Sequence, residues 1–136
     1  MANRIEVALK PHLPDVLGER LARRLRQHLG MDLKQVRIID VYTVDHQGEL
    51  SHEVLEGAAR EALSDPVLQI ASVDRPLARD CDWVLEVGFR PGVTDNVGRT
   101  AREAIELLHG RSTERRLSVF SSKQYLLSGE LPRDVD

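Results

Sequence analysis

The stretch RPGVTDNVGR, residues 90–99, has the residue types of an anion-binding loop. Loop glycines allow backbone N–H groups to converge on a phosphate, and nearby arginines add positive charge. Arg90, Arg99 and Arg102 surround this loop and are our candidates for contact with an anion or a partner protein. The two glycines, Gly92 and Gly98, however, have five residues between them, which fits neither GxGxxG nor the P-loop pattern.

Asp95 favours a structural interpretation of the same loop. A carboxylate would repel a phosphate, but it suits the N-terminus of a helix, where it accepts hydrogen bonds from unpaired N–H groups. We therefore predict that the loop turns the chain, that Asp95 caps a helix, and that Gly98 lets this helix lie close to its strand.

The remaining reactive side chains do not combine into an active site. Five histidines show no metal-ligand spacing, and we expect them to be solvated: His12, His28, His46, His52 and His109. Cys81 has no histidine nearby in the sequence, and Ser121 and Ser122 have no identifiable base. We predict no catalytic residue and no metal or cofactor site in this chain.

Composition excludes several other classes of function. The 136 residues carry a formal net charge of −3 and only five aromatic side chains, which disfavours nucleic-acid binding. No apolar run approaches 18 residues, and the N-terminus lacks a signal sequence, so we expect no membrane contact. A single cysteine fits a reducing, cytoplasmic setting.

The chain contains an internal repeat. Residues 5–30 align with 85–110 at an offset of 80, and six of these 26 positions are identical, against roughly two by chance. After the helix the offset becomes 81, because GEL at 48–50 then matches GEL at 129–131. A single inserted residue within 111–116 explains this change. The shared turn and cap residues are Pro11, Asp15 and Gly18 in the first copy and Pro91, Gly92, Asp95 and Gly98 in the second.

Each copy reads as a strand followed by a helix and another strand. Alternating apolar residues predict strands at 5–9 and 85–89, and apolar residues four apart predict helices up to Gly30 and Gly110. Further strands are expected at 36–44 and 117–120. In the first copy, a helix opened by Ser51 and a strand at 67–73 complete a βαβαβ unit.

We therefore predict an α+β fold of duplicated ferredoxin-like units, with a largely antiparallel sheet covered by helices on one face. Residues 1–80 form a complete unit and residues 81–136 a truncated one, in which PRDVD at 132–136 begins a helix. One helix and one strand are missing from the second unit, so we expect a fragment of a longer polypeptide or a partner that supplies them.

The paired order of strand, KP or RPG, Asp, Gly and helix, with DPVLQ after the second helix, resembles the small-subunit (PurS-type) family of phosphoribosylformylglycinamidine synthase. The resemblance extends to the N-terminal region of the fused enzyme. It implies a part in purine biosynthesis, in the glutamine- and ATP-dependent amidation of formylglycinamide ribonucleotide. It also implies a component of a ligase that is inactive alone and docks the glutaminase and synthase parts, which hold ATP and Mg²⁺.

Two further expectations remain open. An isolated chain of this kind is expected to form a homo-oligomer by pairing of sheet edges. A ferredoxin-like module that binds a small regulatory molecule is the alternative function, with RPGVTDNVG at the interface between the two units as its site. Stabilisation by a ligand would distinguish this alternative from a docking role.

Overall fold

The computed structural model describes residues 2–47, 50–90, 93–109 and 117–130. In chain order its elements are β1 (Ala2–Leu9), α1 (Val16–Leu29), β2 (Asp32–His46), α2 (His52–Glu61), β3 (Gln69–Val73), β4 (Trp83–Gly88), α3 (Asn96–His109) and β5 (Leu117–Glu130). The helix C-cap expected at Gly30 is present in the left-handed conformation, with φ of 62°. Gly110 and the helix expected at 132–136 lie outside the described residues.

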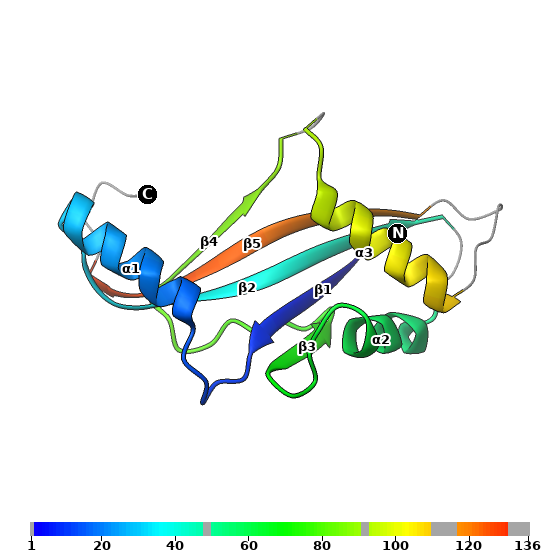
Figure 1. Cartoon of the computed structure of the whole chain (residues 1–136), viewed down its shortest axis with the longest axis horizontal. Helices are drawn as coiled ribbons and strands as arrows, with labels where there is room; N and C mark the ends of the chain where they lie inside the picture. Colours follow the sequence, from blue (N-terminus) through cyan, green and yellow to red (C-terminus); the bar gives the residue numbers. More distant parts are fainter. Residues whose placement is uncertain (1, 48–49, 91–92, 110–116, 131–136) are drawn as a thin grey trace.

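The five strands form one antiparallel sheet in the order β3-β1-β2-β5-β4 (Figure 1). The three helices lie on one face, α1 over one end of the sheet and α2 with α3 over the other (Figure 1). The predicted α+β class and the antiparallel sheet with helices on one face are therefore confirmed. The two units join edge to edge through β2 and β5.

Alternation along β1 explains how this strand is buried. Ile5 and Val7 are buried beneath α2 and α3, while Glu6 and Ala8 point to the opposite face. Full burial of one such aliphatic side chain contributes about 1.5–3 kcal/mol. The helices also bury their apolar faces against the sheet, as Ala22 of α1 and Ile105 of α3 show. Apolar period and burial thus agree along β1 and on the inward faces of α1 and α3, whereas the apolar residues of β4 are exposed.

The repeat is visible in the strand register. Val7 of β1 lies opposite Asp40 of β2, and their counterparts Val87 and Lys123 lie opposite each other in β4 and β5. The first strands are therefore related by an offset of 80 and the second strands by an offset of 83. The predicted offset of 81 is wrong.

The GEL motifs are not structural equivalents. Gly129 lies inside β5 opposite Leu33, near the start of β2, whereas the first GEL follows the end of β2. The strand predicted at 117–120 in fact continues to Glu130. Two short identical triplets misled the alignment because they carry no periodic pattern to fix the register.

The face opposite the helices is crossed by residues 74–82, which connect β3 at one edge to β4 at the other. Leu77, Ala78 and Cys81 of this crossing segment pack on Ile39, Val41 and Leu126 in the middle of the sheet. Both faces of the central strands are therefore partly covered, and the crossing segment ties the two units together.

Candidate docking surface

Two aspartates fasten the start of a helix to the strand that follows it. Asp15 accepts hydrogen bonds from the backbone N–H of Gly18 at 2.8 Å and of Ile38 at 2.8 Å. Asp95 accepts from the N–H of Gly98 at 2.8 Å and of Ser121 at 2.6 Å, and also from the Ser121 hydroxyl. Each carboxylate thus caps a helix and positions the next strand.

The surroundings of Asp95 keep its carboxylate ionised. Burial alone would raise the pKa of Asp95, but hydrogen bonds from Ser121 and Gly98 outweigh it and hold the pKa below the ordinary value of 3.8. Because these N–H groups are bound to a carboxylate of the chain itself, they are not available to a phosphate. Pro91 and Gly92 lie outside the described residues.

Gly18 and Gly98 allow very close approach between helix and strand. A Cβ on Gly18 would stand 2.0 Å from the carbonyl oxygen of Val36, and one on Gly98 would stand 2.4 Å from that of Val119. Any side chain at these two positions would move the helix away from the sheet. Gly98 of the 90–99 loop and its counterpart Gly18 therefore have a packing role in this structure.

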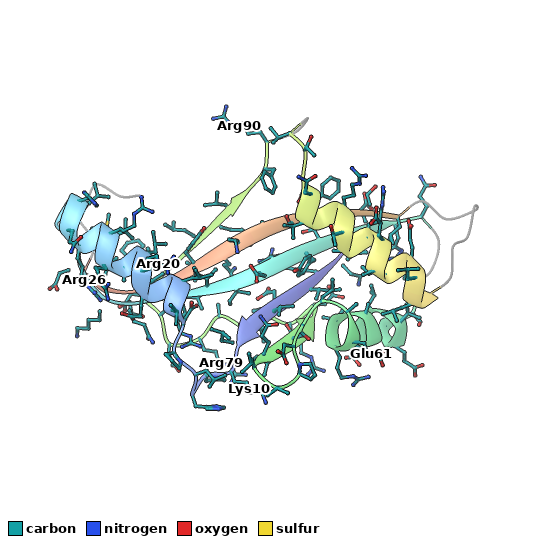
Figure 2. All side chains as sticks on the ribbon, in the orientation of Figure 1. Lys10, Arg20, Arg26, Glu61, Arg79 and Arg90 are labelled. Atoms are coloured by element: carbon teal, nitrogen blue, oxygen red, sulfur yellow. The ribbon has the colours of Figure 1, made fainter. Side chains whose placement is uncertain are left out.

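The three candidate arginines are not gathered into one site. Arg99 and Arg102 each lie one turn before an acidic residue, with nitrogen–oxygen distances of 3.7 Å to Glu103 and 3.9 Å to Glu106. Arg90 follows Phe89 beyond the end of β4 and extends away from the sheet (Figure 2). Of the three, only Arg90 has no side-chain hydrogen bond or ion pair with the described residues.

The two units are related by a twofold axis that passes between β2 and β5. The offset of 83 makes Asp40 and Lys123 equivalent residues, and they lie directly opposite each other in the sheet. Lys123 Nζ donates to Asp40 Oδ1 at 2.8 Å. A pair of this kind had not been predicted, because its position depends on the corrected register.

Two shallow cavities of about 250 and 390 Å³ lie on either side of this pair, on the helical face. Their walls are apolar and belong to equivalent parts of the two units. The middle of the sheet lies between α1 and α3, and none of the three described helices covers it (Figure 1). We define the axial surface as Val16, Leu17, Asp40, Phe89, Val97 and Lys123.

The apolar members of the axial surface are unusually exposed. Leu17 retains 59 % of its accessible area and Val97 retains 53 %, and Val16 and Phe89 are exposed to a similar extent. Equivalent positions in the two units, Leu17 and Val97, thus both present aliphatic side chains to solvent beside the axis. Contiguous exposed apolar surface around a charged pair is typical of a protein interaction site.

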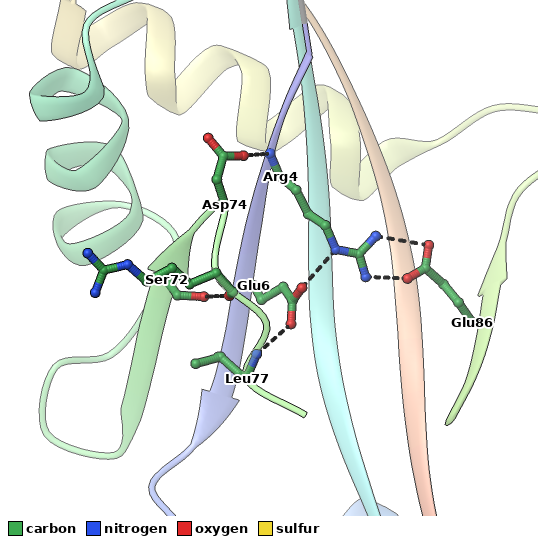
Figure 3. Close-up of polar contacts among 7 residues, drawn as sticks. Arg4, Glu6, Ser72, Asp74, Leu77 and Glu86 are labelled. Atoms are coloured by element: carbon green, nitrogen blue, oxygen red, sulfur yellow. Dashed lines mark hydrogen bonds and ion pairs between the residues drawn. The ribbon is translucent and has the colours of Figure 1, made fainter. Parts of the chain in front are cut away.

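On the opposite face, a polar network joins the two units (Figure 3). Arg4 of β1 binds Glu6 at 2.8 Å and also binds Glu86 of β4 through two guanidinium nitrogens. Glu6 in turn accepts a hydrogen bond from the N–H of Leu77 at 3.0 Å. The pKa of Glu86 lies below its ordinary value, chiefly because Arg4 donates hydrogen bonds to it.

The sequence analysis did not predict this network, although the repeated glutamate at equivalent positions of the two units pointed to it. Glu6 and Glu86 are identical in the repeat and alternate with apolar residues in their strands. Their shared position on the face opposite the helices brings both within reach of Arg4. The network is structural, since it links the crossing segment to β1 and β1 to β4.

The remaining candidates have ordinary surroundings. His46 is buried and bonded to Asn3 Oδ1 at 2.7 Å, so the expectation that it is solvated is wrong. Burial raises the pKa of the Cys81 thiol, which packs beneath the sheet. Among the described residues no group of three or more His, Cys, Asp or Glu side chains could hold a metal ion. In the same part of the chain, no helix has the length and apolarity needed to cross a membrane.

The fold and this surface define a class of protein: an α+β module in which two strand–helix–strand segments join edge to edge and exposed apolar residues surround the axis between β2 and β5. Comparison with protein families gives the match for residues 2–75, to PurS, phosphoribosylformylglycinamidine (FGAM) synthase. The chain therefore belongs to the PurS family, takes part in purine biosynthesis through FGAM synthase, and associates with other components of that enzyme. Searches of curated proteins and of solved structures gave no match.

Proposed function

We propose that this chain is a non-catalytic docking component of FGAM synthase that holds the glutaminase and synthase parts together in the cytoplasm. The observation that carries this proposal is the axial surface, where Leu17 and Val97 remain more than half exposed beside Asp40 and Lys123. Exposed apolar residues on both sides of one axis offer two similar contact areas, one for each unit.

The proposed division of labour leaves the chemistry to the partners. The amidation needs a glutaminase to release ammonia and a synthase that uses ATP and Mg²⁺. Among the described residues, the two carboxylates predicted as helix caps, Asp15 and Asp95, accept hydrogen bonds from the chain itself. We therefore propose that the chain is inactive alone and acts on the reaction by assembly.

Arg90, Arg99 and Arg102 are proposed to contribute to the same docking. Arg90 is the strongest of the three, because its guanidinium is exposed next to Phe89 of the axial surface (Figure 2). Arg99 and Arg102 are partly neutralised by Glu103 and Glu106, so their contribution to partner binding is expected to be smaller.

The double substitution Leu17→Glu with Val97→Glu tests this role. Because both side chains are exposed, the fold should tolerate the change, while two carboxylates on the axial surface should weaken binding to the synthase or glutaminase component more than about tenfold. Binding is measured by titration of the purified partners, with glutamine-dependent FGAM formation as a second measurement.

Leu107→Glu is the matched control, because Leu107 is 79 % exposed on α3 and lies outside the axial surface. Charge reversal at Arg90 should give a smaller loss than the double substitution. If the double variant binds both partners as tightly as the unsubstituted chain does, the axial surface is not the docking surface.

The alternative, a module that binds a small regulatory molecule, has less support. Its expected site in RPGVTDNVG is built around Asp95, whose oxygen atoms already accept hydrogen bonds from the chain. A rise in the melting temperature with an amino acid or nucleotide, in the absence of any partner, would favour this alternative over docking.

A further inference from the structure

β1 and β4 are equivalent strands of the two units, but their outer sides are covered differently. β1 pairs with β3, and α2 packs over the helical face of β1 against α3. β4 is the counterpart of β1, and in the described part of the chain it pairs only with β5. The first unit therefore shows what kind of element fits against β4.

Residues that are core in the first unit are exposed in the second. Ile5 retains 0 % of its accessible area whereas its counterpart Leu85 retains 44 %, and Val7 retains 1 % whereas Val87 retains 59 %. Ala101 and Ile105 of α3, which join the core beneath α2, are fully buried. Their counterparts on α1, Leu21 and Leu25, are only partly buried.

We propose that the open side of β4 binds a helix followed by an antiparallel β-strand, a segment of the same type as α2–β3. The strand would extend the sheet beyond β4, in the register in which β3 meets β1, where Val73 lies opposite Ile5. Leu85 would then face the position equivalent to Val73. The helix would lie across Leu85 and Val87 and contact Leu21 and Leu25 of α1.

The chemistry of this partner segment follows from the first unit. α2 presents Leu55, Ala58 and Ala59 to the core, and its two alanines let it lie close to the sheet. The helix of the bound segment must likewise carry small residues on the face that meets β4. The strand must alternate polar and apolar residues, because β4 would be covered on its helical face only. Edge strands with exposed apolar side chains pair readily with an added strand, which supplies main-chain hydrogen bonds.

A second copy of this chain does not meet these requirements. Each copy has one α2–β3 segment and two equivalent edges, so an exchange of that segment would uncover one β1 for every β4 it covers. Pairing of β4 with β4 of another copy would satisfy the backbone, but it would bring no helix to Leu85 and Val87. The occupant is therefore a helix–strand segment other than the α2–β3 segment of a second copy, and this inference rests on the repeat rather than on the proposed function.

A synthetic peptide with the sequence of residues 50–75 is the probe, because it contains the chain's own α2–β3 segment. Added to the full chain, it should change the fluorescence of Trp83, the only tryptophan and the first residue of β4. It should also slow hydrogen exchange of the Val84–Gly88 amides by more than about tenfold.

Two variants and one altered peptide make the test specific. Val87→Lys should abolish both effects, and unchanged circular dichroism should show that the variant still folds, because Val87 is exposed. Leu107→Glu should leave both effects intact. A peptide with proline in place of the residue corresponding to Ala71, which pairs with Val7 in the intact chain, should not bind.

Three results would overturn the inference. The first is an absence of peptide-dependent protection in β4 of the full chain. The second is protection confined to β1, which would mean that the peptide displaces the resident α2–β3 segment. The third is concentration-dependent dimerisation of the full chain that Val87→Lys abolishes, which would assign β4 to a second copy. None of these results bears on the axial surface, whose variants should still bind the peptide.

Discussion

At the scale of single residues, the same side chains that suggested ligand binding are used to build the fold. Asp95 was correctly placed at the start of a helix from its position before an apolar spacing of four. Its second oxygen, however, accepts the N–H of Ser121, 26 residues further along the chain. No local pattern predicts that contact, because it depends on the register of β5 beneath α3.

Asp95→Asn should destabilise the fold and change its response to acid. The loss of a charged cap and strand contact is expected to lower the free energy of unfolding at pH 7 by about 1–2 kcal/mol. Because the folded pKa of Asp95 is below 3.8, its ionisation stabilises the fold fully above that pH, and the contribution is lost as the pH falls through the folded pKa.

Urea unfolding between pH 2.5 and 7 measures both effects. The variant should show a shallower loss of stability below about pH 4 than the unsubstituted chain. Asp32→Asn, at an exposed position, is the control. An acid response as steep as that of the unsubstituted chain would contradict the role assigned to Asp95.

At the scale of elements, the glycines in the first turns of α1 and α3, Gly18 and Gly98, decide how closely each helix packs on the sheet. Gly18→Ala and Gly98→Ala are each expected to destabilise by about 1–3 kcal/mol, because the added methyl group would meet a backbone carbonyl that cannot move aside. Gly57→Ala is the matched control within α2, where a Cβ has no neighbour within 4 Å.

The control should instead raise stability by about 0.5–1 kcal/mol, because alanine favours the helix. Thermal and urea unfolding of the three variants give the comparison. Equal changes in the free energy of unfolding for Gly18→Ala and Gly57→Ala would show that the close approach of α1 to β2 does not contribute to stability.

Helices and strands were largely predictable from the sequence, because each has a clear apolar period. The helices starting after Asp15, Ser51 and Asp95 appear where they were expected. The continuation of β5 to Glu130 was missed because residues 121–124, SSKQ, are polar. Of this run, Ser121 and Lys123 face the helical side of the sheet, and the exposed Lys123 is part of the axial surface.

The candidate site was less predictable than the fold. Arg90, Arg99 and Arg102 were chosen from their proximity in the sequence, yet Arg99 and Arg102 pair along their own helix. The axial surface combines β2, β5 and the starts of two helices, which lie up to 83 residues apart at equivalent positions. Its position requires the correct register of β5, and an error of two residues in the offset was enough to conceal it.

At the scale of the whole molecule, the internal twofold axis explains why opposite charges can meet at its centre. In a symmetric dimer of two identical units, a residue on the axis faces its own copy, and a charged residue there would face the same charge. In this chain the two equivalent positions hold different residues, Asp40 and Lys123, which form an ion pair. Because both segments belong to one chain, the two positions can hold opposite charges where exact symmetry would impose repulsion.

A charge-exchange cycle at these two positions tests this account. Lys123→Asp and Asp40→Lys each place like charges opposite one another, and each should lower the free energy of unfolding by about 0.5–1 kcal/mol, because both side chains are partly exposed. The variant with both substitutions restores the pair in reverse and should recover most of that loss. Urea unfolding at low and at high salt gives the coupling energy, which should shrink as salt screens the charges. Additive losses in the double variant would contradict a direct pair on the axis. Recovery would support the register given by an offset of 83, in which Asp40 and Lys123 lie opposite each other. The axial surface and the equivalence of β1 and β4 both depend on that register.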